Sequence, residues 1–149
     1  MRLTRIWLSL GLLFAGCQPS PALAQALAEY EQAKEEEYIA VIITEAGGEP
    51  FEGQVGVAEV LRNRGWNTQG FCGLRGHQLA ACRDPVLRSR ADRAITQAKN
   101  GSAITKGATH FENIEAFGWP KWSRGMVVTA KIGHHTFMKK KQKTMMAAK

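Results

Sequence analysis

Two glutamates, Glu45 and Glu49, bracket a tight turn in the stretch 44–50. Glu45 follows an apolar run at 39–43, and two glycines come directly before Glu49. We expect Glu45 to lie at the end of a buried helix, where burial disfavours the ionised carboxylate and raises its pKa toward the working pH. A carboxylic acid in that state is a general acid. The alternative is an ordinary helix end with Glu49 as the next N-cap, because most carboxylates beside turns are solvated.

The first helix is expected to carry Glu45 in its last turn. From residue 29 the sequence consists mainly of strong helix formers, and the run 39–43 continues that pattern, although its β-branched residues would also suit a strand. The acidic cluster 35–37 is predicted to be a solvated first turn, where the helix dipole favours negative charge. The glycine pair 47–48 is predicted to end the helix in the left-handed backbone conformation.

Two further helices are expected after the turn. Pro50 suits the first position of a helix over 51–64, in which Gln54 lies on the apolar face. The pair Asp84-Pro85 predicts the start of a third helix, because aspartate caps exposed N–H groups and proline fits the first helical position. This helix is expected to end at the following Asn-Gly pair.

The pattern changes after residue 105. Residues 108–111 are short and strand-like, and residues 113–122 are predicted to be irregular. Residues 127–132 and 135–138 flank a Gly-His pair, which predicts two short antiparallel strands joined by a turn.

The N-terminus predicts export. Residues 1–5 are positively charged, and the apolar run 6–16 has the length of a signal-peptide core but is too short to span a membrane. Two processing sites remain open. The sequence around Cys17 resembles a bacterial lipobox, which would give a lipid anchor, whereas the Ala-Leu-Ala at 22–24 predicts cleavage before Gln25.

The chain therefore divides into four segments. These are a signal peptide at 1–24, a tether with the first helical turns at 25–37, the main domain at 38–138 and a basic tail at 139–149. The mature protein is expected in the periplasm or cell envelope, either free or as a membrane-anchored lipoprotein.

Two cysteines remain in the expected mature chain, Cys72 and Cys82. In an oxidising compartment they are expected to form one disulfide, which stabilises by roughly 2–3 kcal/mol in the chain-entropy account. Their spacing matches no zinc motif, so we expect neither a metal nor a cofactor. The net charge of +7 favours an anionic partner, and the export signal argues against nucleic acid.

Three segments in order resemble the SleB-type cell wall hydrolases, the spore-cortex-lytic family. The first is Thr-Glu-Ala-Gly-Gly-Glu-Pro-Phe-Glu-Gly-Gln-Val-Gly-Val-Ala at 44–58, followed by Asn-Arg at 63–64. The second is Gly-Ala-Thr-His-Phe-Glu-Asn at 107–113, and the third is Ile-Gly-His-His-Thr-Phe at 132–137. The resemblance implies an α+β fold, a mainly helical lysozyme-like domain with a small antiparallel sheet, over roughly 38–138.

The resemblance also implies an activity, cleavage of the glycan strands of peptidoglycan, with Glu45 as the essential acid. Two residues depart from the family pattern: Gly47 replaces an arginine, and His134 replaces an asparagine. Polar and aromatic side chains of the three segments and their surroundings are expected to line the substrate groove, with structural roles as the alternative for several of them. They are Glu49, Gln54, Thr109, His110, Asn113, Trp122 and His135.

Several chemistries fit these residues. A lytic transglycosylase cuts the MurNAc-GlcNAc bond with one glutamate, whereas a hydrolase needs a second carboxylate, for which Glu49 is the near candidate in sequence. A zinc amidase would use His110, His134 and His135 with Glu45, but no His-Glu-x-x-His helix is present and adjacent histidines on a strand point to opposite faces. A non-catalytic exported module that binds peptidoglycan is the remaining alternative.

Overall fold

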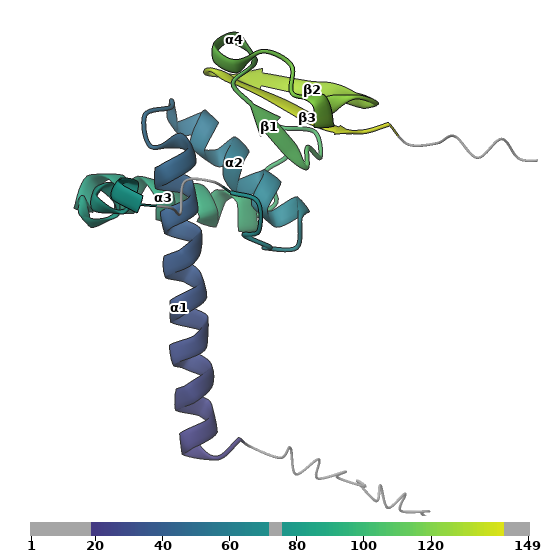
Figure 1. Cartoon of the computed structure of the whole chain (residues 1–149). Coiled ribbons are helices and arrows are strands. Elements are labelled where there is room, and N and C mark those ends of the chain that lie inside the picture. Colours follow the sequence, from purple (N-terminus) through teal and green to yellow (C-terminus); the bar gives the residue numbers. More distant parts are fainter. Residues whose placement is uncertain (1–18, 72–75, 142–149) are drawn as a thin grey trace, which may run out of the picture.

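The computed structural model describes residues 19–71 and 76–141, with helices first and the sheet last (Figure 1). The described part is mostly helical with one three-stranded antiparallel sheet, which confirms the predicted α+β class. The elements are α1 (Pro21–Ala46), α2 (Phe51–Asn63), the 3-10 helix η1 (Gly76–Arg83), α3 (Pro85–Lys99), β1 (His110–Glu112), α4 (Ile114–Phe117), the 3-10 helix η2 (Lys121–Ser123), β2 (Met126–Ile132) and β3 (His135–Lys140).

Helix α1 begins earlier than residue 29, because Ser20 caps it and Pro21 occupies its first position. The Ser20 hydroxyl accepts a hydrogen bond from the Leu23 N–H at 3.3 Å. Residues 25–28, expected to be a tether, are therefore helical, and Figure 1 shows the N-terminal half of α1 extending away from the other helices.

The acidic cluster 35–37 lies within α1 rather than in its first turn. Two of its carboxylates pair with cations of α3, since Lys99 Nζ lies 2.6 Å from Glu35 and Arg88 Nη2 lies 2.6 Å from Glu36. The third carboxylate, Glu37, accepts hydrogen bonds from Thr68 and Lys34. The predicted position in a first turn was wrong, because the helix begins upstream at Pro21, but Glu36 remains exposed as predicted.

The end of α1 differs from the predicted left-handed cap. Gly47 has φ −59° and ψ −32°, a right-handed helical conformation, and its N–H bonds to the Ile43 carbonyl at 2.9 Å. A Cβ at this position would lie 2.4 Å from the Ile43 carbonyl oxygen. Glycine is therefore needed here because the backbone at residue 47 lies so close to that oxygen, and not because the turn requires a positive φ. Pro50 is the N-cap of α2 rather than its first helical residue.

The core lies between α1, α2 and α3, and residues 53–61 of α2 are all buried. Helix α3 begins and ends as predicted, because the Asp84 side chain accepts the N–H groups of Val86 and Leu87. At Gly56, a Cβ would lie 2.5 Å from Cζ of Phe137, so only glycine lets α2 pack this closely against β3. This contact joins the helical part to the sheet.

The sheet has the order β1-β3-β2, and both pairings are antiparallel. Strands β2 and β3 form the predicted hairpin, with Gly133 at φ +58° in the turn. The predicted irregular segment 113–122 contains α4 and the start of η2. Helix α4 forms because the Asn113 side chain accepts the Ala116 N–H and caps it. Strand β3 extends to Lys140, so the predicted tail begins within the sheet.

Four predictions lie wholly or partly outside the described ranges: the signal peptide at 1–24, lipidation of Cys17, a disulfide at Cys72, and the tail beyond residue 141. The expected disulfide partner, Cys82, lies half-buried at the end of η1, and burial raises the pKa of its thiol. Within the described residues, every helix is too short or too polar to cross a membrane.

Candidate active site

A cavity of about 460 Å³ opens beside the end of α1, between the helices and the sheet. Glu45 contributes a half-buried carboxylate to it. The cavity is lined by Glu45, Val60, Arg64, Gly70, Phe71, His110, Phe111, Glu112 and Trp122. It therefore brings together three of the predicted site residues, Glu45, His110 and Trp122, from α1, β1 and η2. Its size falls in the range of small-ligand sites.

The backbone around Glu45 is fixed from both sides. One residue earlier, the Thr44 hydroxyl donates to the Ala40 carbonyl at 2.8 Å. Two residues later, the Gly47 carbonyl accepts a hydrogen bond from Gln54 Nε2 at 3.4 Å. Gln54 is only 1% exposed, so it supports the turn from within the core instead of facing the cavity.

His110 and Trp122 form the part of the cavity wall that comes from the sheet side. Their ring centroids lie 5.4 Å apart, and Trp122 is 45% exposed. The Thr109 hydroxyl lies 2.9 Å from His110 Nδ1, so Thr109 orients the imidazole. Burial lowers the pKa of His110, and the nearby positive charges of Arg64 and Lys140 lower it further, so the ring is neutral at neutral pH.

His135 lies under this wall. It is 7% exposed and packs against Phe111, with ring centroids 4.8 Å apart. Its Nδ1 atom is buried and has no hydrogen-bond partner among the described residues. Burial lowers the pKa of His135, while the carboxylates of Glu49, Glu45 and Glu112 act in the opposite direction.

Asn113 and Glu49 have partners outside the cavity. The Asn113 side chain accepts the Ala116 N–H at 3.0 Å, as the cap of α4. Glu49 contacts the turn between β2 and β3, where its carboxylate accepts the backbone N–H of His134 at 2.9 Å. Neither residue is among those that line the cavity with Glu45.

The cavity also contains charged residues that the sequence did not single out, Glu112 and Arg64. The Glu112 carboxylate accepts the Asn113 N–H at 3.0 Å. The Arg64 guanidinium lies 4.7 Å from the centroid of the Phe71 ring and donates to the Gln69 carbonyl. Glu112 and Arg64 both lie in the segments that carry the family resemblance, and this position was the signal in the sequence that could have identified them as site residues.

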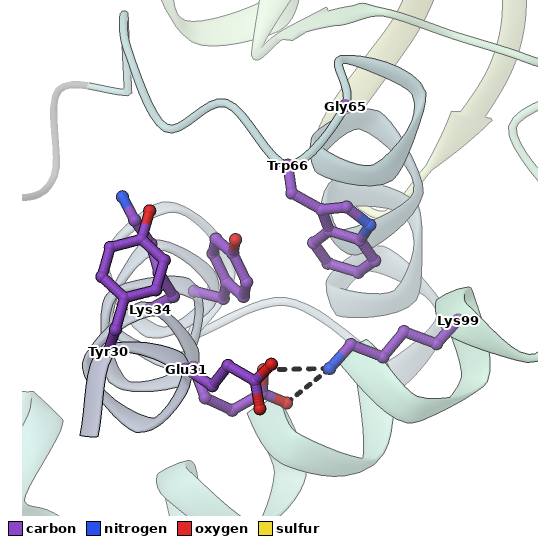
Figure 2. Close-up of a pocket in the computed structure, with 8 residues that line it drawn as sticks. Tyr30, Glu31, Lys34, Gly65, Trp66 and Lys99 are labelled. Carbon is purple, nitrogen blue, oxygen red and sulfur yellow. Dashed lines mark hydrogen bonds and ion pairs between the residues drawn. The ribbon is translucent and has the colours of Figure 1, made fainter. Parts of the chain in front are cut away.

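A second cavity of about 520 Å³ lies between the middle of α1 and the ends of α2 and α3. Figure 2 shows Tyr30 and Lys34 on one wall and Trp66 on the other. Lys99 forms an ion pair with Glu35, and Lys34 forms one with Glu37, so each lysine charge is balanced by a carboxylate. None of the predicted site residues lines this cavity, and we assign the chemistry to the cavity that holds Glu45.

A metal site is not formed by the part of the chain that the structure describes. No group of three or more His, Cys, Asp or Glu side chains is placed there to hold an ion. The zinc-amidase alternative therefore gains no support from the geometry of these residues.

Comparison with known proteins confirms the resemblance. Two similar solved structures are the catalytic domain of the SleB protein of Bacillus cereus and that of the germination-specific lytic transglycosylase SleB of Bacillus anthracis. Each is 26% identical, has a TM-score of 0.54 and covers 72% of this chain, with 91% and 95% of those chains covered. A search of curated proteins finds no match.

A family comparison matches residues 48–138 to the Cell Wall Hydrolase family. The matched range includes α2, α3, β1, β2 and most of β3, and it begins just after Glu45. Because this match spans more than half of the 149 residues, the chain belongs to the Cell Wall Hydrolase family.

Proposed function

We propose that the protein is a lytic transglycosylase that cuts the MurNAc-GlcNAc bond of peptidoglycan, with Glu45 as its single acid and base. The observation that carries the proposal is the position of Glu45 in the wall of a cavity shared by the helices and the sheet. The similar Bacillus anthracis domain is described as a lytic transglycosylase, which supports the same chemistry for this chain.

Cleavage of a glycosidic bond requires a proton on the leaving oxygen as positive charge develops at the sugar ring. In the proposed mechanism the protonated Glu45 delivers that proton. The same carboxylate, then ionised, accepts the proton of the C6 hydroxyl of the muramyl sugar as that oxygen attacks the anomeric carbon. The product is a 1,6-anhydro-muramyl end, and no water is consumed.

The remaining walls of the cavity suit a sugar substrate. Trp122 and Phe71 offer apolar faces, and His110 offers a neutral polar ring. Sugar rings pack their C–H faces on aromatic rings and satisfy their hydroxyl and acetamido groups by hydrogen bonds. We infer that His110 with Thr109 binds such a group, and that Trp122 stacks on a sugar.

A hydrolase is the second candidate, and Glu112 is the observation that favours it. The Glu112 carboxylate lines the same cavity as Glu45. The sequence offered Glu49 as the near candidate for a second carboxylate, but Glu49 does not line this cavity. A second carboxylate can activate water or form a covalent intermediate. Conversion of Glu112 to glutamine separates the candidates, because only a hydrolase that uses it would lose activity by several orders of magnitude.

The Glu45→Gln variant tests the proposal. Glutamine matches glutamate in size but supplies no proton, so we expect at least about 10²-fold loss of glycan cleavage, the contribution typical of general acid-base groups. Binding to isolated peptidoglycan, measured by co-sedimentation, should be unchanged. Retained cleavage would refute the role of Glu45, and binding without cleavage in the wild type would favour the non-catalytic module.

The family places the substrate in the cell wall, outside the cytoplasm. We propose that residues 1–24 export the chain there, and that lipidation of Cys17 anchors it to the membrane. Metabolic labelling with a fatty acid, with Cys17→Ala as the control, distinguishes the lipoprotein from cleavage before Gln25.

A further inference from the structure

Glu49 joins two turns that are far apart in the sequence. It lies in the turn between α1 and α2, and both of its carboxylate oxygens contact His134 in the turn between β2 and β3. Oε2 accepts the backbone N–H of His134 at 2.9 Å, and Oε1 lies 2.9 Å from His134 Nδ1. A carboxylate is only an acceptor, so Nδ1 carries the proton in this contact.

Gly133, the residue before His134, has no side chain, and the Glu49 carboxylate occupies the space where one would lie. A Cβ on Gly133 would lie 2.0 Å from Glu49 Oε2, and Gly133 has φ +58°, a conformation that favours glycine. The backbone of Glu49 is also held, because its N–H bonds to the Ala46 carbonyl at 3.0 Å and its carbonyl accepts Arg90 Nη2 at 3.2 Å. The contact is therefore fixed by backbone as well as side chain.

The Glu49 carboxylate remains charged in this place. Its side chain is only 11% exposed, and burial alone would raise its pKa. The hydrogen bonds from the His134 backbone and ring nevertheless hold the pKa of Glu49 below its usual range. A carboxylate held ionised by two bonds is poorly suited to donate a proton.

The two turns adjoin residues that line or support the cavity. Glu45 lies four residues before Glu49, at the end of α1, and His135 directly follows His134 at the start of β3. The His135 ring packs against Phe111 of the cavity wall, with ring centroids 4.8 Å apart. The Glu49–His134 contact thus ties the end of α1, which carries Glu45, to the start of β3, which pairs with the β1 wall of the cavity.

We propose that Glu49 is a positioning residue, which fixes Glu45 relative to the sheet wall by clamping the β2–β3 turn, and that it transfers no proton. This inference rests on the proposed function of the cavity. A displacement of about 1 Å at a reacting group can reduce a rate by about 10²-fold, so a clamp of this kind affects turnover more than substrate binding.

The test compares Glu49→Ala with Glu49→Gln in the full-length protein, with peptidoglycan cleavage measured over a range of substrate concentrations. We expect Glu49→Ala to lower kcat by about 10²-fold with little change in KM. Glu49→Gln should stay within several-fold of the wild type, because its oxygen accepts the His134 N–H and its NH₂ can donate to the other ring tautomer. Glu52→Ala, an exposed glutamate of α2, is the matched control and should be unaffected.

Gly133→Ala provides an independent probe, because the new methyl group would displace the Glu49 carboxylate. Its control is Gly125→Ala, since Gly125 has φ +80° but no atom within 4 Å of a Cβ. Both substitutions impose left-handed strain, but only the methyl group at Gly133 would meet other atoms, Glu49 Oε2 at 2.0 Å and Pro50 Cδ at 3.1 Å. We expect the kcat loss at Gly133 and not at Gly125, with circular dichroism showing that both variants fold.

Three outcomes would overturn the proposal. Glu49→Gln as inactive as Glu49→Ala would make Glu49 a proton-transfer group. Equal activity of Glu49→Ala and Glu52→Ala would show that the contact with His134 has no role in turnover. An equal loss of kcat in Gly133→Ala and Gly125→Ala would show the same. An inactive wild type, indistinguishable from Glu45→Gln, would instead refute the proposed function.

Discussion

Glu59 of α2 gives the sharpest prediction on stability. Its carboxylate is 0% exposed and holds the loop that leads into β1. Ser102 Oγ and the Ile104 N–H donate to Oε1 at 2.7 and 2.9 Å, and the N–H and hydroxyl of Thr105 donate to Oε2. Replacement by alanine removes the acceptor for all four donors at once.

The size of the effect depends on which donors water can reach. Thr105 is 0% exposed, so its two donors would be left unsatisfied, at about 1–3 kcal/mol each. Ile104 is 37% exposed and Ser102 is half-buried, so water can replace much of what they lose. We expect Glu59→Ala to lower the free energy of unfolding by about 3–5 kcal/mol, and Glu59→Gln, which keeps one oxygen and the shape, by about 1–3 kcal/mol.

Urea unfolding at pH 7, followed by tryptophan fluorescence, measures both variants. Glu52→Ala is the control, and its free energy of unfolding should change by less than about 0.5 kcal/mol, as for ordinary surface substitutions. A change in Glu59→Ala no larger than that of the control would refute the reasoning, because it would mean that the four hydrogen bonds contribute nothing net.

The same contact predicts a pH dependence. Burial alone raises the pKa of the Glu59 carboxyl, but the hydrogen bonds from Ser102 and Thr105 hold its pKa below its usual range. The folded-state pKa is thus lower than the unfolded value of about 4.3, so the stabilisation is complete above about pH 4.3 and is lost as the pH falls through the folded value. The stability difference between wild type and Glu59→Gln should shrink on acidification, and a growing difference would contradict this account.

Three other measurements test the packing and the site. Gly56→Ala should destabilise by about 1–3 kcal/mol in urea unfolding, because its methyl group would overlap Phe137, whereas Gly48→Ala, with open space, should have little effect; equal effects would be inconsistent with the close packing. Trp122→Ala should raise the KM for peptidoglycan several-fold, while Trp119→Ala, outside the cavity lining, should not; the reverse order would move the glycan site. EDTA should leave cleavage unchanged, and inactivation reversed by zinc would favour an amidase.

Local signals in the sequence predicted much of the fold. The Asp84 cap begins α3, and the Gly133 turn joins β2 to β3, because capping and turn geometry depend on a few adjacent residues. The end of α1 was predicted at the right place but with the wrong backbone. Gly47 is needed for its close approach to the Ile43 carbonyl, and no adjacent residue signals that contact.

The composition of the cavity was less accessible from the sequence. Glu112 and Arg64 line the same cavity as Glu45 because β1 pairs with β3 and α2 packs beside α1, which are long-range arrangements. Gln54 was expected to bind substrate, yet it is buried, because the apolar face on which it lies packs into the core. The spacing of residues along α2 identified the apolar face that carries Gln54, but it did not show that this face packs into the core instead of lining the cavity.

The most direct test of the central claim is mass spectrometry of the soluble products that the purified protein releases from peptidoglycan. The account predicts muropeptides with 1,6-anhydro-muramyl ends from the wild type and none from Glu45→Gln. Reducing ends would contradict the single-glutamate mechanism and point to a hydrolase that uses Glu112. Free stem peptides would contradict glycan cleavage altogether.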